Sequence, residues 1–248
     1  MPQDGRNVHE ETVSSGSDGR FLFSGTSNQV LFHVSKPSYY ATSVSFDLNK
    51  YPKGEPVLTL RRILRPQAMI GKKALLRVPI GTSHISYDFL AGDCLPPIGN
   101  GVIADLEITR IRPVPGGAEA CWRAFTSQIV GTGNGVVVDS LNDNSSVGRG
   151  TLLSQYEAPT EGYQPSCDFG NHMRGRLQVA YIKIRSEQPG GPMFGKLLDP
   201  ISYWADFDAD EFEFEYVINR SGARGMEMNM KLITVPAKHE SEYAPEEF

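Results

Sequence analysis

The sequence lacks several features that would place it in a familiar functional class. No stretch approaches the ~18 consecutive apolar residues of a membrane-spanning helix. The opening Met1–Asn7 has no apolar core, so we expect no signal peptide. The three cysteines, Cys94, Cys121 and Cys167, match no zinc or redox spacing, and an odd count fits no closed set of disulfides. We therefore expect reduced thiols in the cytoplasm.

A surplus of positive charge is also absent. The 248 residues carry a net charge of −5, and the pI is about 5.6. This composition argues against a protein that coats nucleic acid by bulk charge. Glycine (25) and proline (17) are abundant instead, which favours many short strands joined by turns.

The last forty residues show the clearest pattern, an alternation of apolar and polar side chains. One face would carry Phe212, Phe214, Tyr216 and Ile218, and the other Glu211, Glu213 and Glu215. After a Gly-rich loop, Met226, Met228, Met230 and Leu232 alternate with polar residues. Side chains of a strand alternate between faces, so this pattern predicts two half-buried antiparallel strands joined as a hairpin.

Similar segments recur along the chain and set the predicted fold class. Strands are expected at 28–35, 41–47, 72–80, 84–90, 102–109, 118–130, 136–139 and 177–184. Any helices should be short, near 60–67 and 195–198. We predict an all-β protein, an antiparallel β-sandwich or jelly roll, with a flexible polar N-terminal arm at 1–20 and a single domain at 21–248.

Charges are unevenly distributed. A basic zone without acids consists of Arg61, Arg62, Arg65, Lys72, Lys73 and Arg77. An acidic zone without bases consists of Asp206, Asp208, Asp210, Glu211, Glu213 and Glu215. The two zones are either solvated surfaces or surfaces that meet, within one molecule or between copies. The basic zone is also a candidate for contact with phosphates, including weak contact with RNA, or with an acidic partner.

The spacing of Asp206, Asp208 and Asp210 follows the rhythm of a calcium-binding loop. Position six of such a loop, Glu211, should be glycine, and position twelve, Val217, should be glutamate, so this is not an EF-hand. A looser calcium site remains one hypothesis, and an acidic entry to a strand is the other. No other cofactor is indicated.

Two further motifs depart from the chemistry they suggest. Gly190–Lys196 has the spacing of a phosphate-binding loop, but Leu197 stands where a hydroxyl residue should hold magnesium, and Pro200 would stop the helix that should follow. His84 shares a strand face with Ser86, but no nucleophile motif accompanies them. We expect no catalytic site.

The segment Phe169–Val179 reads FGNHMRGRLQV. It resembles a strand of picorna-like viral capsid proteins, in which a bulky apolar residue precedes Arg-Gly and an alternating strand. The resemblance implies a single jelly-roll capsid subunit, present in the virion or host cytoplasm. Such a subunit would have no active site and would act by self-assembly, as a homo-oligomer or with other capsid subunits.

Another class of function stays open alongside this one. A carbohydrate- or receptor-binding β-sandwich, lectin-like and possibly calcium-dependent, would use the turn-rich segment 140–173. It would also use the tyrosines of the turn regions, Tyr39, Tyr40, Tyr51, Tyr156 and Tyr163. An enzyme on the same scaffold would need an inward-facing His/Glu cluster, which the sequence does not assemble.

Overall fold

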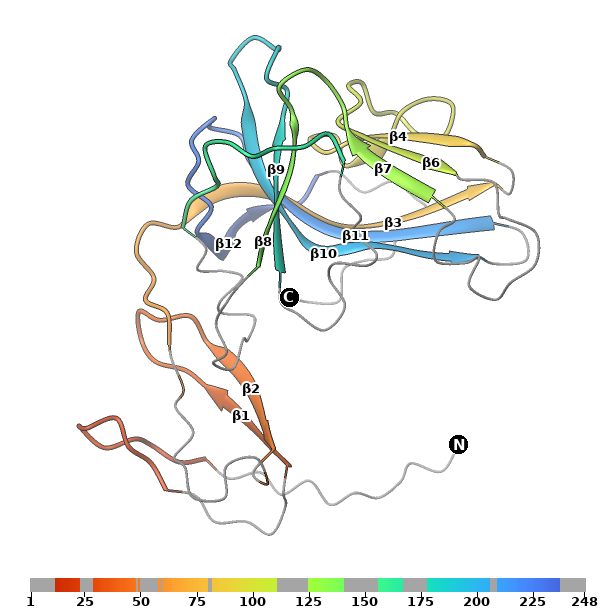
Figure 1. The fold of residues 1–248 in the computed structure, drawn as a ribbon. Coiled ribbons are helices and arrows are strands. Elements are labelled where there is room, and N and C mark those ends of the chain that lie inside the picture. Colours follow the sequence, from red (N-terminus) through yellow and green to blue (C-terminus); the bar gives the residue numbers. More distant parts are fainter. Residues whose placement is uncertain are drawn as a thin grey trace.

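The protein is an all-β sandwich, as the alternation predicts (Figure 1). The computed structural model describes residues 12–22, 29–47, 49, 58, 60–79, 82–110, 125–140, 156–166, 178–205 and 209–236. Within these ranges no residue lies in an α-helix. The predicted arm falls partly outside them, and residues 12–20 form turns and irregular backbone.

Within the described ranges the chain forms twelve strands. They are β1 (Gln29–Val34), β2 (Thr42–Asp47), β3 (Gln67–Pro79), β4 (His84–Asp88), β5 (Asp93–Cys94), β6 (Leu106–Arg110), β7 (Phe125–Ile129), β8 (Gly135–Ser140), β9 (Gln178–Ile184), β10 (Met193–Ala205), β11 (Ala209–Asn219) and β12 (Met228–Thr234).

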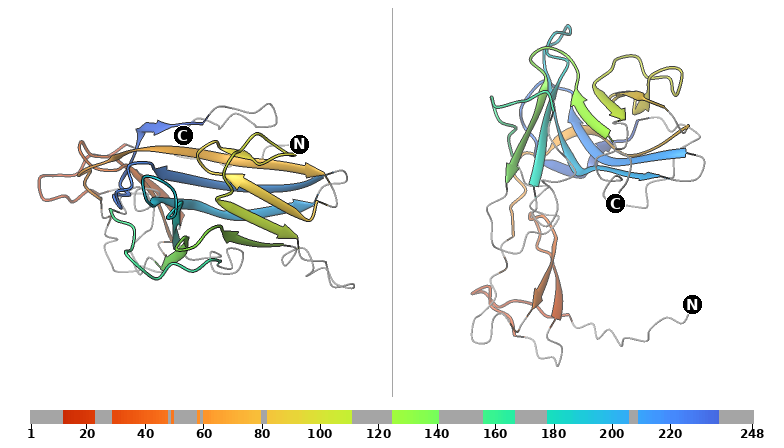
Figure 2. Two further views of the ribbon diagram at one scale, coloured as in Figure 1. Left: turned by 90° about the horizontal axis from the view of Figure 1, so that it is seen from above. Right: turned by 45° about the vertical axis from the view of Figure 1, so that its right-hand side comes forward.

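The sandwich consists of two sheets. One has six strands in the order β12-β3-β11-β10-β9-β8, and the other has four in the order β5-β4-β6-β7. The larger sheet curls so that the smaller one covers its concave face (Figure 2). All pairings are antiparallel except that of β12 with β3.

The main core fills the space between the two sheets. The inward row of β11 supplies four buried side chains, Phe212, Phe214, Tyr216 and Ile218. Opposite them, Tyr87 and Phe89 meet the ring of Phe214 or Tyr216 edge-on or tilted, with Tyr87 and Phe214 centroids 5.1 Å apart. Such aromatic pairs add stabilisation beyond the apolar area that they bury. The predicted inward face of β11 is therefore confirmed.

A second, smaller core lies on the outer face of the six-stranded sheet. Its members come from five strands and from the segments at 158 and 226: Met69, Ala158, Tyr181, Phe194, Val217, Met226 and Met228. The backbone of segment 156–158 pairs with residues 224–226, as Met226 donates its N–H to Tyr156 and Ala158 donates to Arg224. This local pairing closes the small core over part of the sheet.

The predicted C-terminal hairpin is wrong. β11 pairs with β3 and β10, and β12 pairs in parallel with the far edge of β3. Because both edges of β11 are already occupied, the chain after Asn219 must pass beyond β3 to find an open edge. The exposed side chain of Leu232, 42% accessible, also differs from the predicted inward row.

Both predicted short helices are also wrong. Residues 60–66 form irregular backbone that ends at β3, and residues 195–198 lie within β10. Pro200 is accommodated because β9 pairs with β10 only as far as Leu197, so the far half of β10 needs no N–H on that side. The register of β10 against β11 shifts between Leu197 and Asp199 and again between Asp199 and Ser202, the interval that contains this proline.

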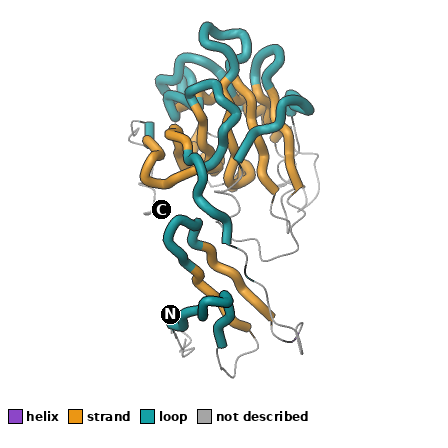
Figure 3. The backbone as a smooth tube through the Cα atoms, turned by 90° about the vertical axis from the view of Figure 1, so that its left-hand side faces the viewer, coloured by secondary structure: helices purple, strands orange, loops and turns teal. Residues whose placement is uncertain are grey.

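The third sheet is the hairpin β1–β2, which projects from one end of the sandwich (Figures 1 and 3). Phe32 lies edge-on between Phe46 of the paired strand and Phe21 of the preceding segment, with centroids 5.7 and 5.6 Å away. The turn of the hairpin faces the sandwich, where Tyr40 and Ile63 form backbone hydrogen bonds with Arg61 and Ser38. The prediction that 21–248 is a single domain stays a prediction.

Candidate interaction surfaces

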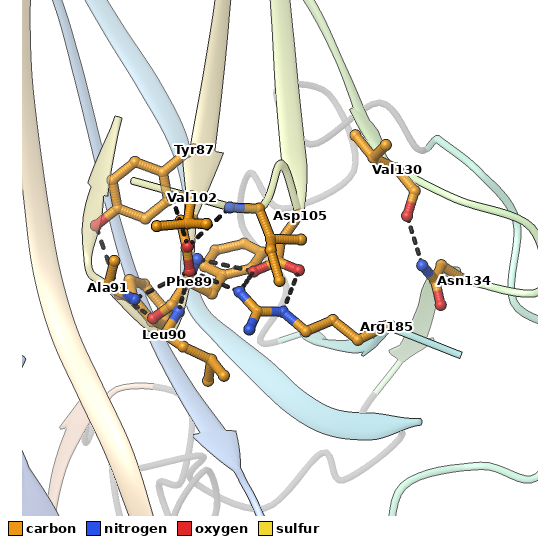
Figure 4. A network of polar contacts seen from close by, with 12 residues as sticks. Tyr87, Phe89, Leu90, Ala91, Val102, Asp105, Val130, Asn134 and Arg185 are labelled. Atoms are coloured by element: carbon orange, nitrogen blue, oxygen red, sulfur yellow. Dashed lines mark hydrogen bonds and ion pairs between the residues drawn. The ribbon is translucent and has the colours of Figure 1, made fainter. Parts of the chain in front are cut away.

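A buried ionic network closes the loop end of the sandwich (Figure 4). Arg185, at the end of β9, donates two hydrogen bonds to the carboxylate of Asp105, at 2.9 and 2.8 Å, and a third to Asp88 at 2.6 Å. All three side chains are at most 9% exposed. Arg185 has a positive φ of 56°, a conformation that a non-glycine residue holds only where the surroundings impose it.

Backbone N–H groups occupy the remaining acceptor sites of the two carboxylates. Asp88 accepts from the N–H groups of Leu90, Ala91, Val102 and Ile103 at 2.9–3.0 Å. Burial alone would raise the pKa of Asp88, but these donors and Arg185 hold that pKa below its usual value. Since its acceptors are used internally, Asp88 pins the loop between β4 and β6.

The other carboxylate of this network behaves differently. Burial raises the pKa of Asp105, although the hydrogen bonds and charge of Arg185 oppose the rise. Its second oxygen also accepts from the N–H of Phe89 at 3.0 Å. The network therefore joins β9 to both ends of the 88–105 loop, and its polar atoms are engaged in holding the fold.

A second buried polar cluster joins the hairpin to the sandwich. The carboxylate of Glu227 accepts from the hydroxyl of Tyr40 at 3.0 Å, from the N–H of Leu64 at 2.6 Å and from the N–H of Arg65. Tyr40 also donates to the carbonyl of Met228 at 2.7 Å. One carboxylate thus holds the hairpin turn, the linker before β3 and the start of β12 together.

Lys196 lies fully buried on the same outer side of the sheet. Its register partners are Val217 and Tyr181, both members of the small core. Burial lowers the pKa of this lysine to about 7, and the negative charge of Glu227 only partly offsets the shift. The segment Gly190–Lys196 therefore does not form a phosphate-binding loop. Its first two glycines lie in a turn and its last residues belong to β10, so it provides no helix N-terminus to receive a phosphate.

The described residues that most resemble a catalytic triad surround His84, on the outer face of the four-stranded sheet. Its Nε2 lies 3.1 Å from the hydroxyl of Ser86 and 3.7 Å from Glu107, while Nδ1 lies 3.4 Å from Thr109. A triad needs the hydroxyl and the carboxylate on opposite ring nitrogens, and here both approach the same one. The carboxylate also accepts from Gln128 at 2.7 Å. This face is a row of mutually bonded polar side chains.

The predicted calcium loop lies mostly outside the described residues. Asp206 and Asp208 fall outside them, and the backbone of Asp210 is part of β11, paired with Val78. Across the described part of the chain, no group of three or more His, Cys, Asp or Glu side chains is placed to hold a metal ion. Calcium binding stays a prediction.

The basic and acidic zones meet within the molecule. Lys73 pairs with Glu213 at 2.5 Å and Arg77 with Glu211 at 3.6 Å, across the β3–β11 ladder. The other basic residues are dispersed. Lys72 is buried and donates to the carbonyl of Gly92 at 2.5 Å. Arg61, Arg62 and Arg65 lie in the linker before β3, where their backbone groups bond to Tyr40, Tyr156 and Glu227.

The turn tyrosines are less exposed for contact with a glycan or receptor than the sequence suggests. Tyr40 is only 6% exposed, because its hydroxyl is drawn into the junction. Tyr163 is half-buried and donates to Pro159, and Tyr156 donates to Arg62. The sequence analysis named Tyr40 only as a turn tyrosine, and it missed Glu227, Asp105 and Arg185. The one sequence signal for the ionic network was Asp88, an acid between a strand and the turn that follows it.

Exposed aliphatic side chains occur on and near the hairpin as well as on the sandwich, where Val102, Leu232 and Val235 are exposed. Leu22 is 89% exposed and Leu31 57%, and Leu64, also 57%, lies in the linker at the base of the hairpin.

Two of the three cysteines, at positions 121 and 167, lie outside the described ranges. Cys94 is buried and forms no disulfide. No helix in the described ranges has the length and apolarity to cross a membrane.

Comparison with known proteins returns no relative: no protein-family profile, curated protein or solved structure matches this chain.

Proposed function

We propose that this protein is a non-enzymatic, self-assembling structural subunit of a viral capsid, acting in the virion or host cytoplasm with further copies or other capsid subunits as partners. The observation that carries the proposal is the β1–β2 hairpin, which projects from the sandwich and exposes Leu31, while Leu22 is exposed in the segment that precedes it. A two-stranded sheet is at best marginally stable in water without further packing. A neighbouring subunit would supply that packing.

The sandwich offers a rigid body for such a role. Its core is continuous between the sheets, and its buried polar groups are engaged in internal bonds at the loop end and at the junction. Contact between subunits, through the hairpin and the remaining sheet surfaces, is the activity that these features support. The polar face around His84 and Glu107 favours glycan binding as the alternative, since hydroxyl, imidazole, carboxylate and amide groups lie side by side there.

The test is light scattering on the purified full chain after size exclusion, followed by electron microscopy of any large species. Closed shells or regular oligomers are the expected result. Leu31→Lys should reduce assembly, because a charge on the projecting hairpin opposes burial against a neighbour. Val102→Lys is the matched control, since Val102 is 80% exposed but lies on a loop of the sandwich.

The proposal would be contradicted if the original chain and the Leu31→Lys variant both scattered light as monomers at all concentrations. Binding to an immobilised glycan that is lost on replacing Glu107 by Gln would favour the alternative. Calcium dependence is read in the same assays by adding a chelator.

A further inference from the structure

Two rows of opposite charge run side by side on the outer face of the six-stranded sheet. On β3 the inward row is Ala74, Leu76 and Val78, so Lys73 and Arg77 project outward. On β11 the inward row is aromatic, so Glu211, Glu213 and Glu215 project outward. The Lys73 and Arg77 side chains are 48% and 51% exposed, and Glu213 and Glu211 keep 29% and 30%. The pairs satisfy one another and still present charge to the surroundings.

This arrangement is self-complementary under one particular symmetry. Neighbouring strands lie about 4.8 Å apart, so the rows are close and parallel. A two-fold axis in the plane of the contact, parallel to the strands and between the rows, places the basic row of each copy over the acidic row of the other. Two-fold interfaces require such a patch, because the same surface must serve both partners.

Other partners fit these rows less well. β12 pairs with β3 only as far as Ile70, so the rest of that edge could pair with a second copy. Antiparallel pairing of this stretch about Leu75 would set Lys73 of each copy opposite Arg77 of the other, and like charges directly opposite destabilise a sheet. A phosphate backbone would meet the acidic row beside the basic one, at a net charge of −5. The half-buried Leu75, between the two cations, gives the face an apolar centre.

We propose that the outer face of β3 and β11 is a contact between two copies of this chain, related by that two-fold axis and selected by the charge rows. This inference rests on the proposed self-assembly and names a second contact surface beside the hairpin. Exposed ion pairs contribute little affinity, so the rows set partner choice and orientation rather than strength.

The test is a charge inversion that preserves the pairs within each molecule. The inverted chain carries Lys73→Glu, Arg77→Glu, Glu211→Arg, Glu213→Lys and Glu215→Lys, which changes the net charge only from −5 to −3. Basic and acidic rows exchange places, so two inverted chains remain complementary. An inverted chain facing the original one sets like charges against each other in both rows.

Self-association of each chain and mixing of the two are measured by light scattering and by energy transfer between labelled copies. We expect the inverted chain to associate with itself within about threefold of the original chain. Association of the mixed pair should be at least tenfold weaker at low salt, and the difference should shrink as salt screens the charges.

Two half-inverted chains extend the design. One carries only Lys73→Glu and Arg77→Glu, and the other only Glu211→Arg, Glu213→Lys and Glu215→Lys. Each should associate poorly with itself and well with the other, and circular dichroism checks that both fold. Free mixing of original and inverted chains, in a protein that does assemble, overturns this surface and leaves the proposed function standing. An original chain that never self-associates overturns both.

Discussion

The sandwich and the hairpin are built from the same kind of strand but differ in how completely each is packed. In the sandwich, Phe214 is fully buried between two sheets, and the charges of Arg185 and Asp105 are paired inside. In the hairpin, Phe32 has an aromatic partner on each side, while Leu31 on the other face is more than half exposed. The sandwich therefore buries its core within one chain, whereas the hairpin leaves apolar surface exposed.

The largest effect should come from the core of the sandwich. Phe214→Ala removes a fully buried ring and is expected to lower the free energy of unfolding by about 3–5 kcal/mol. Phe32→Ala in the hairpin should cost less than about 1 kcal/mol, because that ring is only half-buried. Urea denaturation followed by circular dichroism measures both. Equal losses would mean that the two regions fold as one unit and would remove the distinction.

The buried ionic network should give the next largest effect. Arg185→Met leaves Asp88 and Asp105 buried without their cation, which is expected to cost about 3 kcal/mol. Arg224→Met is the matched control, since it removes an exposed pair with Glu157 and one hydrogen bond to the carbonyl of Ala158, which together should contribute about 1 kcal/mol. A small loss for Arg185→Met would show that backbone donors alone hold the loop end.

The sequence predicted which face of β11 is buried because a period of two is a local property. It did not predict the neighbours of that strand, since pairing depends on which edges remain open after the rest of the sheet forms. Alternation in Met226 to Leu232 suggested a hairpin with β11, whereas the open edge was on β3. Alternation shows which face of a strand is buried, but it does not show which strand will be its partner, because the same pattern fits any open edge of a sheet.

The polar clusters were largely beyond prediction for a related reason. Asp105 and Arg185 lie 80 residues apart in the chain, as do many pairs that never meet. The charge zones were visible in the sequence, and their meeting between β3 and β11 was one of the alternatives left open. The register of two strands decided it, placing Glu211 opposite Arg77.

The buried Lys196 makes the stability of the sandwich depend on pH. Lys196 has a folded pKa of about 7, below its ordinary value near 10.5. Between these values the unfolded chain binds a proton that the folded chain does not, so stability rises with pH, by up to about 1.4 kcal/mol per unit. Below pH ~7 the full cost of burying the cation is present, and above about 10.5 it vanishes.

Lys196→Met isolates this contribution from that of the other titrating groups. The difference in unfolding free energy between the variant and the original chain should be largest below pH ~7 and should narrow as the pH rises toward 10. Denaturation at a series of pH values measures it. A difference independent of pH would show that water reaches the ammonium group in the folded protein.

The smallest effect tests the junction between the two regions. Tyr40→Phe removes the hydroxyl that joins Glu227 and Met228 to the hairpin turn, and should cost about 1 kcal/mol, since Glu227 keeps its two backbone donors. The loss should appear as faster proteolysis in the hairpin rather than in global unfolding, because the sandwich core is untouched. Tyr156→Phe, whose hydroxyl reaches the same linker from a more exposed position, is the control. If cleavage instead accelerates equally in both variants, Glu227 is not the anchor of the hairpin, and the appendage is held by its linker alone.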